Sequence, residues 1–169
     1  MLKRIIWRFL GTVEHRDGRP DSAHGGGVAI VVADGVACIK LDKVRRPVLP
    51  VNACSVLVYS SEKAEICLRL TGIYLPPPPT ATVTAEWLGP LSDRENQSYD
   101  AKGRMISHLI VGDFNQHSWK GGTDKRYHER LLDIGAWELS DPFLPTFKTG
   151  STLDKFVLLP GYEFPQSFL

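Results

Sequence analysis

The sequence predicts an α+β fold in which β-sheets are faced by helices, and two observations favour it. Short apolar runs with β-branched residues, separated by Gly, Pro and Asp, dominate the first half of the chain and are typical of strands. Helical spacing appears later, between further short strands, without the strict alternation of a parallel wound sheet. The 169 residues, 43% of them apolar and 23% charged, fit a single domain over residues 1–169.

Most of the expected strands lie in the first half of the chain. They cover Ile5–Leu10, Val28–Ala33, Val36–Leu41, Ser55–Tyr59 and Ile66–Leu75. The turn residues at Ala33–Gly35 predict a hairpin between the second and third of these runs, and so an antiparallel sheet. Pro76–Pro79 end the strand that runs through Tyr74, because proline has no amide hydrogen to donate to a sheet.

The second half mixes helices with strands. The elements expected there are a helix at Val83–Leu88, a strand at His108–Val111, a helix at Asp124–Ile134 and a strand at Leu153–Leu159. The polar stretch Ser92–Lys102 has a helical composition but a weak amphipathic pattern, so its state stays open. Trp137 and Leu139 are interpreted as core packing.

The net charge and the cysteine content bear on the protein's binding partners and its cellular compartment. The net charge of +1 gives no long-range attraction for a polyanion, so any nucleic-acid binding would depend on local basic patches. The alternative is that these patches are solvated loops without a binding role. These patches are Lys40, Lys43, Arg45 and Arg46, and Lys120, Lys125 and Arg126. The three cysteines are odd in number and lie in apolar runs, which indicates buried free thiols. With no signal peptide and no membrane-spanning run, we expect an intracellular protein that does not enter a membrane.

The strongest candidate site lies at Gly112–Asn115, where an apolar strand ends in Gly-Asp-Phe-Asn. Residues two apart on an extended chain share a face, so Asp113 and Asn115 should project together while Phe114 points away. An aspartate supplies a hard oxygen for Mg²⁺ or orients a water, and an asparagine holds a water or a phosphate oxygen without adding charge. The alternative is a simple turn after a buried strand.

Two further residues could join that site. Asp154 stands within an apolar strand and shares a face with Phe156 and Leu158, so alternation predicts a carboxylate that needs a partner instead of one on a solvated face. Tyr74 brings a phenol to the end of another strand, although a core aromatic residue is the alternative.

Four segments in the same order carry a family resemblance. They are Gly26–Ile30, Tyr74–Pro77, Gly112–Asn115 with His117, and Ser151–Asp154. Together they resemble the endonuclease/exonuclease/phosphatase superfamily, and within it the apurinic/apyrimidinic-like endonuclease domains of trypanosome-type non-LTR retrotransposons. The resemblance spans roughly residues 25–160.

The resemblance implies a four-layer α/β/β/α sandwich that nicks DNA with Mg²⁺ or Mn²⁺. In that family Tyr74 would contact the scissile phosphate, and Asp113 would activate water or bind the metal. Asn115 would position the water or the phosphate and join the metal site, and Asp154 would orient a catalytic histidine. His117 and Trp119 would lie at the rim. The partners would be DNA and a reverse transcriptase of the same element, and the location the nucleus.

The sequence also departs from the family. It has no Gln-Glu-Thr with a metal-binding Glu before Gly26, no Asn on a first strand, and no Ser-Asp-His after Asp154. We therefore expect an incomplete sandwich that lacks its first strands and its last one, and a fragment that is inactive by itself. The alternatives are a non-catalytic retroelement remnant and a phosphatase of the same superfamily that acts on lipids or inositol phosphates.

Overall fold

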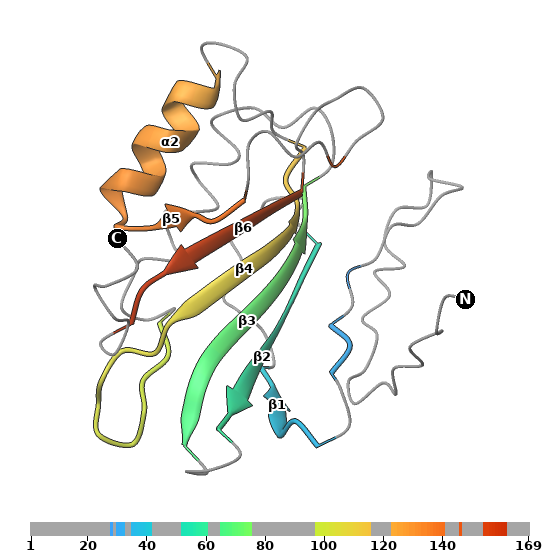
Figure 1. Cartoon of the computed structure of the whole chain (residues 1–169), viewed down its shortest axis with the longest axis vertical. Coiled ribbons are helices and arrows are strands. Elements are labelled where there is room, and N and C mark those ends of the chain that lie inside the picture. Colours follow the sequence, from blue (N-terminus) through green and yellow to red (C-terminus); the bar gives the residue numbers. More distant parts are fainter. Residues whose placement is uncertain are drawn as a thin grey trace.

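The strands in the part of the chain that the structure describes form one mixed sheet. The computed structural model describes residues 28, 30–32, 35–41, 52–60, 65–75, 97–115, 123–140, 146 and 154–161. The elements are β1 (Cys38–Lys40), β2 (Asn52–Tyr59), β3 (Ile66–Tyr74), β4 (His108–Asp113), α2 (Thr123–Asp133), β5 (Trp137–Glu138) and β6 (Asp154–Leu159). The six strands lie in the order β1-β2-β3-β4-β6-β5 (Figure 1). Only the β3–β4 pair is parallel among them.

The strands predicted at Ser55–Tyr59, Ile66–Leu75, His108–Val111 and Leu153–Leu159 are confirmed as β2, β3, β4 and β6. β2 begins three residues earlier than expected, at Asn52, and β4 continues two residues further, to Asp113. The expected helix at Asp124–Ile134 is confirmed as α2. The two-residue strand β5 was not expected from Trp137 and Leu139, and Leu139 is 54% exposed, so its interpretation as core packing is wrong.

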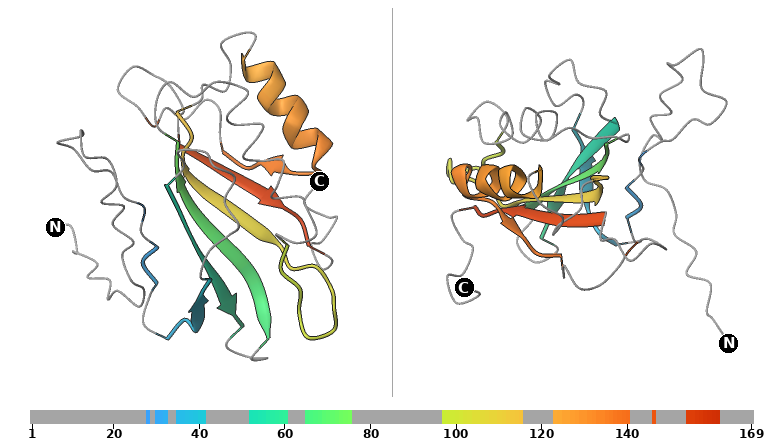
Figure 2. Two further views of the ribbon diagram at one scale, coloured as in Figure 1. Left: turned by 180° about the vertical axis from the view of Figure 1, so that it is seen from behind. Right: turned by 90° about the horizontal axis from the view of Figure 1, so that it is seen from above.

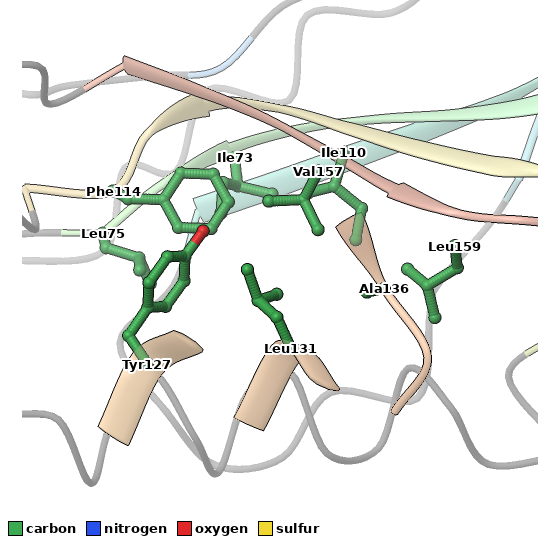
Figure 3. Close-up of a cluster of buried hydrophobic side chains, with 9 residues drawn as sticks. All are labelled: Ile73, Leu75, Ile110, Phe114, Tyr127, Leu131, Ala136, Val157 and Leu159. Carbon is green, nitrogen blue, oxygen red and sulfur yellow. The ribbon is translucent and has the colours of Figure 1, made fainter. Parts of the chain in front are cut away.

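The hydrophobic core lies between α2 and one face of the sheet. Tyr127 and Leu131, one helical turn apart, point from α2 toward the sheet (Figure 3). The core consists of Ile73, Leu75, Ile110, Phe114, Tyr127, Leu131, Ala136, Val157 and Leu159. Further views show α2 near the β5 end of the sheet (Figure 2). We call this side of the sheet the helix face.

The helix face also buries a polar chain that crosses three strands. Ser55 Oγ lies 2.7 Å from Thr71 Oγ1, which in turn lies 2.7 Å from His108 Nε2. Burial, and to a smaller extent the nearby Arg69 cation, lower the pKa of His108 to about 3. His108 is therefore neutral at physiological pH and ties β4 to β3 through a hydrogen bond.

The opposite face, which we call the open face, carries a different layer. A side chain at Gly72 would come within 2.8 Å of Val28 Cγ1 and 3.5 Å of Ile30 Cγ1, so Val28 and Ile30 pack across β3 there. Residues 28 and 30–32 are not part of a strand, and the expected strand at Val28–Ala33 is wrong for these residues. β1 pairs with β2 instead of forming the predicted hairpin. The α+β class agrees with the structure, whereas a second sheet is not seen among the described residues.

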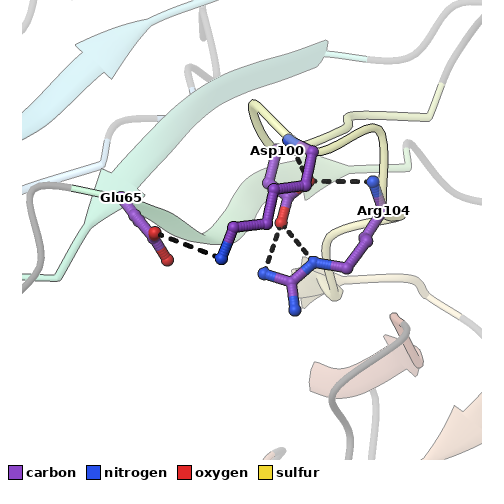
Figure 4. Close-up of polar contacts among 4 residues, drawn as sticks. Glu65, Asp100 and Arg104 are labelled. Carbon is purple, nitrogen blue, oxygen red and sulfur yellow. Dashed lines mark hydrogen bonds and ion pairs between the residues drawn. The ribbon is translucent and has the colours of Figure 1, made fainter.

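A tight loop precedes β4 on the way into the sheet. Asp100 accepts hydrogen bonds from the backbone amides of Lys102 and Arg104 and forms an ion pair with the Arg104 guanidinium (Figure 4). The Lys102 ammonium nitrogen Nζ lies 3.8 Å from Oε1 of Glu65, the residue before β3. The described part of Ser92–Lys102, for which no state was predicted, is thus a turn instead of a helix. The expected elements Ile5–Leu10 and Val83–Leu88 lie outside the described residues.

Candidate functional site

Three of the four predicted site residues form one row across the sheet. Tyr74 at the end of β3 is the register partner of Asp113 at the end of β4, and Asp113 is the register partner of Asp154 at the start of β6. Laterally paired residues of a sheet share a face. By alternation from the buried Ile110 and Phe114, that face is the open one. We call Tyr74, Asp113 and Asp154 the polar row.

The two carboxylates of the polar row belong to the closer type of antiparallel pair. The Asp113 carbonyl accepts a hydrogen bond from the amide of Leu75, the residue directly after β3, and the Asp154 amide donates to Thr146 Oγ1. Neither backbone group is turned toward the facing residue, so Asp113 and Asp154 form a non-hydrogen-bonded pair. Such pairs have Cα atoms about 4.5 Å apart and side chains in close proximity.

Proximity and burial both act on Asp113. Burial raises the pKa of its carboxyl group, the amide of Asn115 counteracts this by donating to Oδ1 at 2.8 Å, and the negative charge of Asp154 raises the pKa further. The net direction is upward. Asp113 is therefore a stronger proton acceptor than an ordinary aspartate.

The residues around Asp113 explain why the strand ends in Gly-Asp-Phe-Asn. A side chain at Gly112, whose φ is +152°, would collide with the carbonyl oxygen of Ile73 on β3. Phe114 is fully buried on the helix face, with its ring edge toward Tyr127 of α2 at a centroid distance of 6.2 Å. The glycine thus allows the close approach of β3 and β4, and the phenylalanine fixes which face Asp113 takes.

Asn115 joins the site in a different way from the predicted one. Its φ of +47° places it in the left-handed region, so Asp113 and Asn115 do not project together from one extended strand. A turn brings them together instead, through the hydrogen bond from the Asn115 amide to Asp113 Oδ1. The side-chain nitrogen Nδ2 donates to the Leu75 carbonyl at 2.6 Å. The amide oxygen Oδ1 is consequently the atom that Asn115 can offer to a water or a cation.

Asp154 is exposed, and the expectation that alternation keeps it off a solvated face is wrong. It does share a face with Phe156 and Leu158, as predicted. That face is only partly covered, because Phe156 is 47% exposed while Leu158 is buried. Asp154 therefore reaches solvent while it faces Asp113.

The donor atoms at the polar row suit a hard divalent cation. The carboxylate of Asp113 and the amide oxygen of Asn115 are ligand types that Mg²⁺ and Mn²⁺ prefer, and a cation held there would also relieve the repulsion between Asp113 and Asp154. Within the described ranges, no group of three or more His, Cys, Asp or Glu side chains comes together. Asp113 and Asn115 would leave most coordination positions of such a cation to water, as is usual for Mg²⁺.

The sequence did not indicate a charged cluster on the other side of the same strand ends. Lys155, directly after Asp154, is fully buried on the helix face, with Nζ 3.1 Å from Glu138 Oε1 of β5 and 5.1 Å from the ring centroid of Tyr127. Alternation did predict that Lys155 takes the face opposite Asp154. A lysine between a carboxylate and an aromatic residue could not, however, be recognised as buried from its sequence neighbours.

Several other residues that the sequence singled out lie outside the described part of the structure. His117 and Trp119 lie outside the described residues, as do Lys43, Arg45, Arg46 and Lys120, and the side chains of Lys125 and Arg126. The cysteines are free as expected, but Cys67 is exposed and only Cys38 and Cys54 are partly buried. In the part of the chain that the structure describes, no helix has the length and apolar character to cross a membrane.

Comparisons with known proteins find a likeness of fold. No protein-family model matches the chain, and no curated protein matches it. Among solved structures, the fold is similar to that of the endonuclease domain of TRAS1, a telomere-specific non-LTR retrotransposon, with a TM-score of 0.54 and 17% sequence identity. The match covers 75% of this chain and 56% of that domain, so the chain spans a little over half of the structure that it resembles. The fold is thus endonuclease-like.

Proposed function

We propose that this chain carries the catalytic strand ends of a metal-dependent phosphodiesterase, the DNA-nicking endonuclease of a non-LTR retrotransposon. The observation that carries the proposal is the polar row, in which two carboxylates and a phenol from three adjacent strands share one face beside Asn115. The similarity of fold to a retrotransposon endonuclease domain also supports it. Tyr74, Asp113, Asn115 and Asp154 come from separate parts of the sequence and lie together at one end of the sheet.

In this proposal Asp113 accepts a proton from the attacking water. Its raised pKa suits that role, because a base acts best when its pKa approaches the working pH. Asn115 accepts a hydrogen bond from the same water through Oδ1, since its Nδ2 is bound to the Leu75 carbonyl. The phenol of Tyr74 contacts the scissile phosphate.

Asp113 and Asn115 would hold Mg²⁺ or Mn²⁺, and the bound cation would stabilise the negative charge that develops on the phosphate. Asp154 would orient a histidine, as the resemblance implies. The 169 residues contain no Asp-His pair to supply that histidine in the family's manner, so we propose that this fragment is inactive by itself. The family resemblance leads us to propose DNA as the substrate, a reverse transcriptase of the same element as partner, and a nuclear location.

The proposal can be tested without activity, by paramagnetic NMR. Mn²⁺ alone should broaden the backbone signals of Tyr74, Asp113, Asn115 and Asp154 before those of the opposite end of the sheet, near Arg69. A short DNA duplex added with Mg²⁺ should shift the signals of the polar row. Asp113→Asn should weaken the Mn²⁺ effect by about tenfold or more in concentration, because a charged oxygen ligand is lost.

Glu65→Gln is a matched control, since it removes an exposed carboxylate at the other end of β3 and should leave Mn²⁺ binding unchanged. Broadening that is centred elsewhere, or that persists in Asp113→Asn, would count against the proposal. Shifts caused by an inositol phosphate but not by DNA would favour the phosphatase alternative. No response to either ligand would favour a non-catalytic remnant.

A further inference from the structure

The helix face directly beneath the polar row contains a buried ion pair. Lys155 has an exposed fraction of 0%, and its ammonium group lies 3.1 Å from Glu138 Oε1 and over the ring of Tyr127. Burial raises the pKa of the Tyr127 phenol, and the negative charge of Glu138 raises it further. The two side chains thus surround a lysine that water does not reach. We call Tyr127, Glu138 and Lys155 the Tyr127 cluster.

The Tyr127 cluster is linked to both facing carboxylates through the residues that follow them in the sequence. Lys155 directly follows Asp154 on β6, and Phe114 directly follows Asp113 at the end of β4. The ring of Tyr127 meets Phe114 at an interplanar angle of 69° and lies beneath the Lys155 ammonium. Lys155 is also the register partner of Gly112, which has no side chain to interrupt its path across the helix face. One aromatic ring of α2 is therefore in contact with both strand ends.

Stability alone does not account for a lysine at this position. Removing an ammonium and a carboxylate from water costs several kcal/mol per ion, and well-packed apolar residues in place of a buried ion pair are often equally or more stable. The facing carboxylates add a second unfavourable term, because like charges directly opposite one another destabilise an antiparallel pair. Two strand ends that repel each other on one face need a restraint from the other.

We propose that Lys155, held by Glu138 and Tyr127, is a positioning residue that keeps Asp154 directly opposite Asp113. The ammonium fixes the start of β6 to β5 and to α2, so that the neighbouring carboxylate cannot turn away from Asp113. Calling these carboxylates a site rests on the proposed function. The geometric role of Lys155 does not, because it concerns only the pairing of two backbone positions.

The test measures how often positions 113 and 154 meet. In a chain whose Cys38, Cys54 and Cys67 are replaced by alanine, the pair Asp113→Cys and Asp154→Cys should form a disulfide, since non-hydrogen-bonded pairs have the short Cα separation that a disulfide needs. The equilibrium with a reduced and oxidised glutathione buffer gives the effective concentration of the two thiols. Lys155→Met should lower that concentration by about tenfold or more.

Two further variants separate positioning from stability. Lys155→Met with Glu138→Leu should recover the melting temperature, because no charge is left unpaired, but should not recover the effective concentration. Lys155→Arg keeps a cation within reach of Glu138 and should retain the effective concentration to within about threefold. This measurement needs no nuclease activity and no metal, so its failure would leave the Mn²⁺ and DNA experiments unaffected.

Three outcomes would overturn the proposal. The disulfide could fail to form when Lys155 is present, which would mean that the two positions do not meet. Lys155→Met could leave the effective concentration unchanged. The double variant could restore both the melting temperature and the effective concentration, which would assign the effect to packing alone.

Discussion

Asp113 is the residue on which burial and a like charge act together. Because its pKa in the folded state is raised, the folded protein binds a proton at pH values where the unfolded chain has lost it. The stability that the protonated group contributes is present below the unfolded pKa and is lost as the pH rises through the folded pKa. At neutral pH the ionised carboxylate therefore opposes folding.

We predict that Asp113→Asn leaves the protein equally stable or more stable near neutral pH, by up to ~1 kcal/mol, since water screens a partly exposed pair. An asparagine can still accept the hydrogen bond from the Asn115 amide and no longer repels Asp154. Urea denaturation at pH 7 and pH 3 measures this, and the difference between the variants should vanish at the lower pH. A clear loss of stability at pH 7 would indicate that the carboxylate has a cationic partner.

His108 has the opposite pH dependence for stability. Its pKa is lowered by burial first and by Arg69 second, to about 3, whereas an unfolded histidine titrates near 6.5. The unfolded chain thus binds a proton that the folded protein excludes. The stability is present in full above pH ~6.5 and is lost as the pH falls toward ~3, by up to ~1.4 kcal/mol per pH unit.

We predict that His108→Gln reduces this slope while it keeps a hydrogen-bonding group opposite Thr71. Neutral glutamine remains neutral in both states, so the acid loss that remains in the variant comes from other groups. The measurement is the free energy of unfolding of both proteins at intervals from pH 7.5 to pH 4. Parallel curves would show that His108 is accessible to protons in the folded protein.

At the scale of elements, the parallel pairing of β3 and β4 sets the spacing of the polar row. At Gly112 the backbone of Ile73 on β3 occupies the place that a side chain would take. We predict that Gly112→Ala destabilises the protein by about 2–4 kcal/mol, through a collision with backbone that cannot move aside. Gly135→Ala is the matched control, since Gly135 also has a positive φ, +66°, but has open space around it.

The control should cost about 1–2 kcal/mol, the strain of a left-handed residue alone. Thermal unfolding of both variants gives the comparison. An equal effect of the two substitutions would mean that backbone strain, and not the approach of β3 to β4, is the reason for the glycine.

The elements that could be predicted are those whose local pattern agrees with their packing. α2 places Tyr127 and Leu131 on one side, and β4 is apolar enough to be recognised as buried. β5 could not be predicted, because two residues carry no periodicity and their pairing with β6 depends on long-range contact. Val28 and Ile30 have the composition of a strand, yet they pack across Gly72 as side chains on a sheet face.

The candidate site was predicted in part for the same reason. The family resemblance predicted Tyr74, Asp113, Asn115 and Asp154 together at strand ends, and the strand register brings Tyr74, Asp113 and Asp154 to a common face. The turn at Asn115, the burial of Lys155 and the exposure of Asp154 depend on what lies over each face of the sheet. Sequence periodicity shows which residues of a strand share a face of the sheet, but not which part of the protein covers that face.

At the scale of the whole molecule, the polar row lies beside an incompletely covered face. Phe156, two residues from Asp154, and Leu139 of the neighbouring segment are both about half exposed on the open face. A phosphodiesterase site needs fixed groups around the phosphate and a limited access of water, since preorganised charges act most strongly where water is excluded. The described residues supply the facing carboxylates but leave them in contact with solvent.

We therefore predict negligible nicking of supercoiled plasmid DNA by this 169-residue chain with Mg²⁺. Its sequence contains neither Gln-Glu-Thr nor Ser-Asp-His, and the loss of a metal ligand and of a catalytic histidine should each remove about two or more decades of rate. The assay follows conversion of supercoiled to relaxed plasmid on a gel, with Asp113→Ala as the control for contaminating nuclease. Equal, trace nicking by both proteins is the expected result. Mg²⁺-dependent nicking that Asp113→Ala abolishes would contradict the prediction and would show that Tyr74, Asp113, Asn115 and Asp154 suffice for catalysis without those motifs.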